Sequence, residues 1–160
     1  MNIRAAQPKD RAAILAIILP TIRQGATYAV DADMSEGDAI NYWTSNEKQT
    51  FVAELDGQIL GTYYMRANHS GGGGHVCNCG YMTGASATGK GVARAMCTHS
   101  LTYARTRGYR AMQFNFVIST NVRAIALWES LGFEIVGRLP GAFAHPTQGY
   151  VDALVFYQTL

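Results

Sequence analysis

The sequence predicts one mixed α/β domain over residues 1–160, and three observations support this. The chain has 160 residues, of which 48% are apolar and 15% are charged, as is typical of a globular domain with a buried core. Strand-like segments rich in β-branched and aromatic residues alternate with segments of helical periodicity. The chain contains no linker-like stretch that would divide it into two domains.

The first quarter of the chain predicts a short strand followed by two helices. The strand covers residues 3–6, and Pro8 after it is tolerated in the first turn of a helix. Isoleucines then recur at helical spacing as far as Gly25, which predicts the end of the first helix. Ser35, with Asp38 three positions later, predicts the start of the second helix.

The middle of the chain predicts three strands, over residues 51–55, 59–65 and 75–83. Asp56-Gly57 separates the first two, and this dipeptide between two strand-like runs is typical of a tight hairpin turn. These segments therefore predict a sheet built from neighbouring antiparallel strands.

The last third predicts two helices and three strands. A helix over residues 91–107 ends at a glycine, as does a helix over residues 122–131, and a strand over residues 111–118 lies between them. Residues 133–137 and 150–157 are the last two strands. The predicted order is β-α-α-β-β-β-α-β-α-β-β, with seven strands and four helices.

Composition argues against several classes of protein. The formal net charge is only +2 and Lys and Arg form no run, so we expect no nucleic-acid partner. The longest aliphatic stretch, residues 12–19, is far shorter than the roughly 20 residues needed to span a bilayer. We therefore expect no leader peptide and no membrane association.

The three cysteines predict a reducing compartment, so we expect a cytoplasmic protein. Cys77 and Cys79 are too close for an ordinary disulfide, and Cys97 leaves an odd number. His75, Cys77 and Cys79 alternate along a predicted strand, whereas zinc knuckles use Cys-x-x-Cys pairs. We therefore expect no metal site.

The turn Gly89-Lys90-Gly91 joins a predicted strand to a predicted helix. Free backbone N–H groups and the positive end of a helix dipole bind phosphate groups at such turns. Gly84, Gly89 and Lys90 match most of a P-loop, but Gly91 stands where the magnesium-binding Ser or Thr is required. Arg94 stands where a dinucleotide-binding motif has its third glycine. The turn alone leaves the phosphate ligand open.

Two motifs in the correct order resemble the GCN5-related N-acetyltransferase (GNAT) family. The first family motif is Q/R-x-x-G-x-G/A, and residues 88–93 fill it except at the first position, where Thr88 stands. The second is an Asn followed by a helix that ends in an aromatic residue and Gly-Phe, and residues 121–133 are similar to it almost throughout. The predicted element order also matches along nearly the whole chain. The last hairpin is most similar to bacterial phosphinothricin and small-amine acetyltransferases.

The resemblance implies the GNAT fold, with a mixed, mostly antiparallel sheet, and acetyl-CoA as cosubstrate without a metal. In this family a central strand pairs with the pantetheine arm, a glycine turn holds the pyrophosphate, and the second motif contacts the arm. The residues that carry these roles over are Tyr81, Met82 and Thr83 for the strand, Gly89, Lys90, Gly91, Val92, Ala93 and Arg94 for the turn, and Asn121 and Trp128 for the arm.

Two positions depart from the family pattern. Thr88 replaces the usual Gln or Arg, which reduces side-chain help near the phosphates. Trp128 stands where many members have a Tyr that protonates the departing thiolate, and an indole N–H is no acid for that task. Solvent or another residue must then protonate the thiolate.

The implied chemistry is direct transfer, in which a neutral amine attacks the thioester carbonyl and must lose a proton. Glu54, on a predicted strand, is a candidate base. Asn78 is a candidate for orienting the substrate, because alternation places it opposite Cys77 and Cys79, just before the expected separation of strands near Gly80.

The acceptor site is expected to involve the first inter-helix loop and the last hairpin, with Tyr28, His145 and Asp152 as candidates. The expected function is N-acetyltransfer to the amine of a small molecule, an amino acid or an analogue. One alternative is acetylation of a protein N-terminus or lysine, and another is a catalytically weak acyl-CoA-binding module. We also expect a homodimer through the C-terminal strands.

Overall fold

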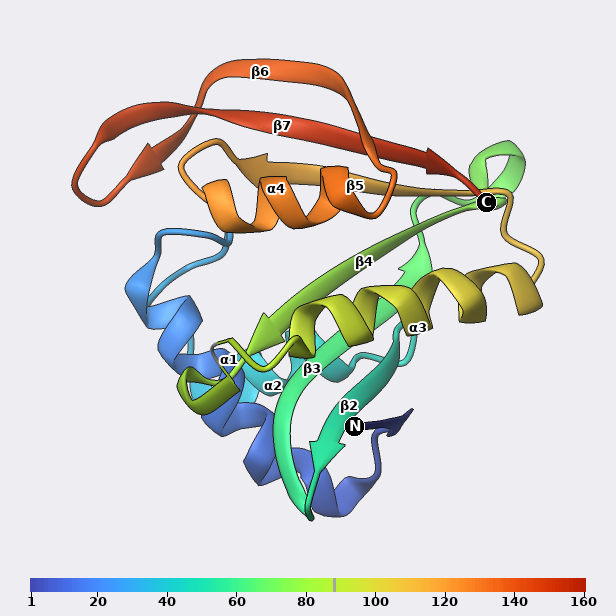
Figure 1. Ribbon diagram of the computed structural model, residues 1–160. Coiled ribbons are helices and arrows are strands. Elements are labelled where there is room, and N and C mark those ends of the chain that lie inside the picture. The colour runs from blue at the N-terminus through green and yellow to red at the C-terminus, as the bar shows by residue number, and fades with distance from the viewer. Residues whose placement is uncertain (88) are drawn as a thin grey trace.

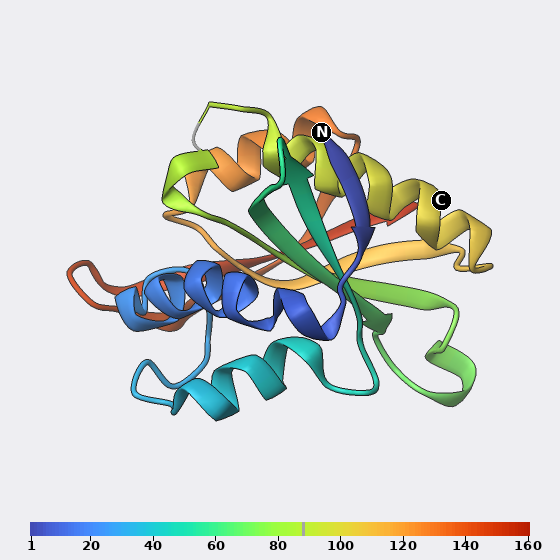
Figure 2. The same cartoon turned by 90° about the horizontal axis from the view of Figure 1, so that it is seen from below.

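The computed structural model describes residues 1–87 and 89–160, so Thr88 lies outside the described residues. A seven-stranded sheet in the order β1-β2-β3-β4-β5-β7-β6 forms the middle layer of the molecule (Figure 1). Helices α1 and α2 cover one face of the sheet, and α3 and α4 lie on the other (Figure 2). The predicted fold class and element order are confirmed.

The first elements are β1 (Asn2–Ala5), α1 (Arg11–Gln24) and α2 (Glu36–Thr44), with a short 3-10 turn (Pro8–Asp10) before α1. Gly25 ends α1 in the left-handed conformation, with φ of 62°, which costs little without a Cβ. Ser35 caps α2, because its hydroxyl accepts a hydrogen bond from the Asp38 N–H at 3.0 Å. Both helix-end predictions are confirmed.

Strands β2 (Gln49–Leu55), β3 (Gln58–Ala67) and β4 (Val76–Thr83) form an antiparallel meander beside β1. Asp56 and Gly57 turn between β2 and β3 with φ of 50° and 77°. Positive φ at both central residues is typical of a type I′ turn, which matches the twist of the two strands. The hairpin prediction is confirmed.

The remaining elements are α3 (Val92–Thr106), β5 (Ala111–Ile118), α4 (Val122–Ser130), β6 (Glu134–His145) and β7 (Gly149–Thr159). The last two strands are longer than predicted. Pairing of β6 with β7 continues past Pro140, with a register shift between Leu139 and Phe143. A proline is tolerated here because β6 is an edge strand of the sheet.

Each face of the sheet has its own apolar core. One cluster packs β3 and β4 side chains against α3 and includes Tyr63, Cys77 and Met96, and the other packs α1 and α2 around Trp43 and Val52. Among the described residues, no helix has the length and apolar character needed to span a bilayer.

The sheet forks between β4 and β5. These strands are parallel and pair only through Val76 with Ala111 and Cys77 with Met112, after which they diverge (Figure 1). The sequence placed this separation near Gly80, whereas the paired register ends at Cys77. Just beyond the last backbone pair, Asn78 Nδ2 donates to the Gln113 carbonyl at 2.9 Å, so a side-chain hydrogen bond joins the two strands where the ladder has ended.

Candidate active site

The fork exposes one backbone edge of β4. The Asn68 N–H donates to the Val76 carbonyl at 2.8 Å and the Gly84 N–H donates to the Leu60 carbonyl at 2.9 Å, so even-numbered positions of β4 direct their backbone groups toward β3. The backbone groups of Cys79, Tyr81 and Thr83 therefore point into the fork. An extended ligand can pair with such an edge as an added strand.

The glycine turn lies between β4 and α3. Gly89 and Gly91 have φ of 75° and 71°, and a Cβ added at either would meet no atom within 4 Å. Gly91 is the N-cap residue of α3, so the first N–H groups of that helix have no acceptor within the helix itself. The Arg94 guanidinium instead donates to Ser130 Oγ at 2.8 Å. The backbone of the turn is thus suited to an anion.

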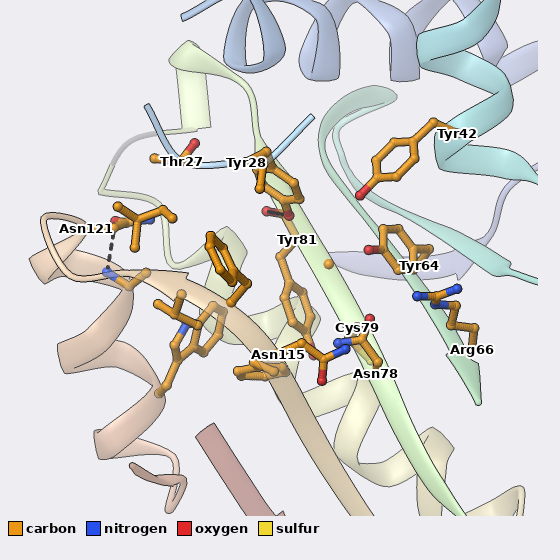
Figure 3. Close-up of a pocket in the computed structure, with 18 residues that line it drawn as sticks. Thr27, Tyr28, Tyr42, Tyr64, Arg66, Asn78, Cys79, Tyr81, Asn115 and Asn121 are labelled. Atoms are coloured by element: carbon orange, nitrogen blue, oxygen red, sulfur yellow. Dashed lines mark hydrogen bonds between the residues drawn. The ribbon is translucent and has the colours of Figure 1, made fainter. Parts of the chain in front are cut away.

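A cavity of about 290 Å³ opens inside the fork. Its walls come from the α1–α2 loop, α2, β3, β4, β5 and α4, and aromatic side chains line much of it (Figure 3). Of the residues predicted for the site, Tyr28, Asn78, Tyr81, Asn121 and Trp128 line this cavity.

Tyr28 connects the α1–α2 loop to β4. Its hydroxyl donates to the Tyr81 carbonyl at 3.0 Å, on the edge that faces the fork (Figure 3). Its ring packs edge-on against Trp43, with centroids 5.9 Å apart. Tyr28 also lines a second hollow with Phe143 and Ala144, so its side chain lies between the two cavities.

Asn78 lies at the base of the fork, next to three further carboxamide side chains that are hydrogen-bonded to one another. Its Nδ2 is committed to the Gln113 carbonyl, which leaves Oδ1 as the hydrogen-bond acceptor on this cavity-lining residue. The Gln113 side chain donates to Asn115 Oδ1 at 2.9 Å, and Asn115 donates to Asn68 Oδ1 at 2.7 Å. These hydrogen bonds connect β4 and β5 with Asn68, the residue that follows β3.

Asn121 and Trp128 bring α4 to the cavity. Asn121 Oδ1 accepts a hydrogen bond from the Ala124 N–H at 3.4 Å and so caps α4 (Figure 3). The same residue also lines the cavity. Trp128 is 7% exposed, and its ring lies 5.1 Å from Tyr81 and 5.0 Å from Phe114 between centroids. The indole is both a core group and a wall of the cavity.

Three of the residues predicted for catalysis or acceptor binding, Glu54, His145 and Asp152, lie outside the cavity lining. Glu54, on β2, accepts a hydrogen bond from Arg4 Nε at 2.8 Å. His145 follows Ala144 at the end of β6, with its ring 6.3 Å from that of Phe143. Asp152 accepts hydrogen bonds from Arg138 and from a backbone N–H of the same hairpin.

The structure adds Tyr42, Tyr64 and Arg66 to the cavity, and sequence reasoning missed them. Arg66 pairs loosely with Glu47, at 3.6 Å between Nη1 and Oε1. A signal existed in β3, where strict alternation places residues 64 and 66 on one face of a predicted strand. Whether this face of β3 lines a cavity depends on the position of α2, and the sequence pattern alone does not predict that position.

Lys48 lies behind this wall. Its Nζ is 3.9 Å from the Tyr42 ring centroid and 4.3 Å from that of Tyr64, and it donates to the Tyr42 carbonyl. Burial, reinforced by the nearby Arg66 charge, lowers the pKa of Lys48 to about 8, against the opposing effect of Glu47.

Burial also affects the neutral acids of the site. It raises the pKa of Tyr28, Tyr64 and Tyr81, because a phenolate in this environment would lose its hydration. The pKa of the Cys79 thiol is raised for the same reason. Within the described part of the chain, no group of three or more His, Cys, Asp or Glu side chains is arranged to hold a metal ion.

Comparison with known proteins decides what this arrangement is. A model of the acetyltransferase (GNAT) family matches residues 19–133. The chain belongs to the GNAT family. It is an acetyltransferase that uses acetyl-CoA. Two features of the structure fit this ligand: the unpaired edge of β4 in the fork, and the turn at Gly89 and Gly91, where an added Cβ would meet no atom within 4 Å.

Individual GNAT relatives agree with this assignment. The chain is 30% identical to the N-acetyltransferase aca1 of Schizosaccharomyces pombe, with 84% of this chain and 73% of the relative covered. A GCN5-related N-acetyltransferase structure from Kribbella flavida is 39% identical, with a TM-score of 0.94 and coverage of 99% and 97%. The fold also matches a phosphinothricin acetyltransferase from Sinorhizobium meliloti in complex with acetyl-CoA, at 21% identity, a TM-score of 0.86 and coverage of 99% and 88%.

Proposed function

We propose that this acetyltransferase acts on the amine of a small molecule, an amino acid or an amino-acid analogue, by direct transfer. The observation that carries the proposal is the walled cavity of about 290 Å³ inside the fork, whose lining includes the Arg66 residue and the Asn78 carboxamide. A guanidinium binds a carboxylate, and an amide oxygen accepts a hydrogen bond from an amine, so the two ends of an amino acid have complementary partners.

The proposed cofactor contacts follow the open β4 edge and the turn. The backbone of Tyr81, Met82 and Thr83 lies along the proposed path of the pantetheine arm, although alternation directs only the outer two toward the fork. The turn residues Gly89 to Arg94 would bind the pyrophosphate through N–H groups, with Lys90 adding an exposed charge.

The α4 residues would border the reacting end. Asn121 and Trp128 line the cavity, and the indole offers a flat apolar surface to the arm. Bound acetyl-CoA supplies an acetyl thioester whose carbonyl carbon accepts the lone pair of the amine. The N–C bond would form as the C–S bond breaks, the nitrogen would lose a proton to solvent and the thiolate would gain one, and backbone N–H groups of the β4 edge would stabilise the carbonyl oxygen.

The proposed roles of the acceptor residues follow their positions. Asn78 would orient the amine through Oδ1, and Tyr28 would shape the pocket. His145 would act at the outer hollow, beside Phe143 and Ala144. Glu54 receives no part in proton removal, because its carboxylate is engaged by Arg4 outside the cavity.

The test compares acceptor classes directly. CoA release from acetyl-CoA is measured with free amino acids, with their amides, and with peptides that present the same amino acid at the N-terminus or a lysine side chain. We expect the free amino acids to give the highest kcat/KM, and Arg66→Met to lower it for them by about tenfold or more, the loss that corresponds to about 1.4 kcal/mol.

Two other results would contradict the proposal. Higher kcat/KM with peptides would support the protein acetyltransferase alternative. Tight CoA binding without thiol release for any amine would support the acyl-CoA-binding alternative.

We propose a homodimer and a cytoplasmic location as further features. Ile135, Val136, Leu139 and Tyr150 expose apolar surface on the β6–β7 hairpin, which a second copy would cover. Leu139→Lys with Val136→Lys should then yield a monomer in sedimentation analysis. The three buried cysteines are free thiols, which favours a reducing compartment.

A further inference from the structure

The cavity inside the fork has a neighbour on the outer side of the α1–α2 loop. We call the cavity of about 290 Å³ in the fork the inner cavity, and the second hollow, of about 580 Å³, the outer hollow. The outer hollow is open to the surface, and its lining consists of residues 28–32, Gly25, Met34, Phe143 and Ala144. Tyr28 and Ala29 line both spaces, so these two residues form the partition between them.

Tyr28 supplies the bulk of this partition, because the Ala29 side chain ends at Cβ. The Tyr28 hydroxyl donates to the Tyr81 carbonyl at 3.0 Å, and its ring is edge-on to Trp43 with centroids 5.9 Å apart (Figure 3). Trp43 is 0% exposed, and its indole N–H donates to Thr62 Oγ1 at 3.0 Å. The phenol is therefore held at its tip by the β4 edge and along its ring by a side chain fixed in the core.

The backbone that carries Tyr28 is also held in place. The Arg23 guanidinium, near the end of α1, donates to the carbonyls of Ala32 and Met34, the latter at 2.7 Å. The β6–β7 turn packs close to the same loop, since a Cβ added at Gly25 would stand 3.7 Å from Ala32 Cβ and 3.9 Å from Pro146 Cγ. The loop is thus tied at several points, and the fold sets the position of the partition.

The partition lies at a distance from the groups proposed to bind the acceptor. Arg66 and Asn78 are directly opposite each other in the pairing of β3 with β4. Tyr81, which holds the Tyr28 hydroxyl, lies three positions farther along β4 than Asn78, or about 10 Å at the rise of a strand. Figure 3 shows Arg66 and Asn78 at one end of the group of lining residues and Thr27 and Tyr28 at the other.

The outer hollow has a different chemistry from the inner cavity. Val30, Met34 and Phe143 give it apolar walls, and its charged lining residue, Asp31, is exposed. An apolar chain that entered this hollow would gain free energy by leaving water. The Tyr28 ring stands between that surface and the inner cavity.

We propose that Tyr28 sets the maximum length of the acceptor. The amine and carboxylate of the acceptor amino acid lie at Asn78 and Arg66, its side chain extends toward Tyr28, and the phenol ring stops it short of the outer hollow. This inference rests on the proposed function. Tyr28 takes no part in the chemistry of transfer. It determines specificity, and shortening it opens the apolar outer hollow to longer side chains.

The experiment measures kcat/KM for CoA release with free amino acids that differ only by methylenes: alanine, 2-aminobutyrate, norvaline, norleucine, 2-aminoheptanoate and 2-aminooctanoate. In the wild type, kcat/KM should fall by about tenfold or more at the first methylene that meets the ring, since a pocket discriminates a methylene by about that factor. In Tyr28→Ala this fall should move to a longer member of the series.

Three further variants separate the partition from a general loosening of the site. Tyr28→Phe removes the hydroxyl and keeps the ring, so its length limit should equal that of the wild type. Tyr28→Leu also shortens the side chain but keeps an apolar contact with Trp43, and it tests the limit if Tyr28→Ala does not fold. Met34→Trp fills part of the outer hollow without lining the inner cavity. Alone it should leave the limit unchanged, and combined with Tyr28→Ala it should restore the shorter limit.

An unchanged length limit in Tyr28→Ala and Tyr28→Leu would overturn the inference while the proposed function stands. A limit that moved equally in Tyr28→Phe, or that Met34→Trp did not restore, would overturn it too, because the ring or the outer hollow would then have no part in it. CoA release with peptides but with none of the free amino acids would contradict the proposed acceptor class instead.

Binding provides a readout that needs no turnover. Calorimetric titration of 2-aminooctanoate into the CoA complex should give a Kd about tenfold lower or more for Tyr28→Ala than for the wild type. The Kd of alanine should be the same for both proteins. An equal change for the two amino acids would overturn the inference.

Discussion

Gly80→Ala should narrow the cavity inside the fork on the side of Tyr64. Gly80 lies on β4 and lines the cavity, and a Cβ added there would stand 2.6 Å from Tyr64 Cε1 and 2.8 Å from Cζ. The ring would have to withdraw by roughly 0.8 Å to reach 3.4 Å, where ordinary van der Waals contact begins. It has little room, because Tyr64 is 6% exposed and its ring lies edge-on to Trp43 at 4.8 Å.

Overpacking of this kind costs about 1–3 kcal/mol. For a domain of this size, that corresponds to a fall in Tm of roughly 2–12 °C, at 2–4 °C per kcal/mol. We also expect KM for the acceptor amine to rise, since Tyr64 is part of the cavity wall, while KM for acetyl-CoA stays the same. Scanning calorimetry and steady-state CoA release measure the two effects.

Gly72→Ala is the matched control. A Cβ at Gly72 meets no atom within 4 Å, and its φ is not in the left-handed region. This variant should keep its Tm or gain slightly, because alanine restricts the unfolded chain. If Gly80→Ala behaved like this control in both Tm and acceptor KM, the assignment of Tyr64 as a fixed wall would be refuted.

Three further predictions test the turn, the indole and an ion pair outside the site. Gly91→Glu should raise KM for acetyl-CoA by about tenfold, which corresponds to about 1.4 kcal/mol. Gly108→Glu is the control, because Gly108 has a similar positive φ and open space at the other end of α3, and it should leave this KM unchanged. Equal effects of the two substitutions would contradict the turn as the pyrophosphate site. Trp128→Phe should leave kcat within a few fold, since general acids contribute about 10²–10⁴-fold, and a hundredfold loss would make the indole essential. Hydrogen bonds from Arg4 hold the pKa of Asp10 below its usual value near 4, so the folding stability that they contribute is complete above pH 4 and is lost as the pH falls through the lowered pKa. Asp10→Asn should therefore lower the free energy of unfolding at pH 7, as measured with urea. In this variant the free energy of unfolding should also change less between pH 7 and acidic pH.

The sequence predicted helix ends and turns correctly where residues close in sequence determine them. Ser35 as a helix cap, Gly25 as a helix end and the Asp56-Gly57 turn each depend on side chains or dihedrals within a few positions. The family motifs added the mixed, mostly antiparallel sheet and the cofactor. The extension of the last hairpin past Pro140 was missed, because pairing at an edge strand tolerates a residue that would end an interior strand.

The acceptor pocket was harder to predict, because its wall forms between elements distant in sequence. Arg66 and Tyr64 reach the cavity only when α2 and the α1–α2 loop pack over β3. Glu54 was a reasonable candidate as a carboxylate on a central strand. Its partner, Arg4, lies 50 positions earlier and meets it only through the pairing of β1 with β2.

The two-rung junction of β4 with β5 makes the molecule two half-sheets on a short hinge. Side-chain contacts between the halves, such as Arg94 with Ser130 and Tyr81 with Trp128, lie along the fork rather than across a continuous ladder. A ligand that pairs with the β4 edge and packs on α4 would act as a missing rung. Amide hydrogen exchange in both halves should then slow together when CoA binds, and the gain in unfolding free energy should grow as RT ln(1 + [CoA]/Kd).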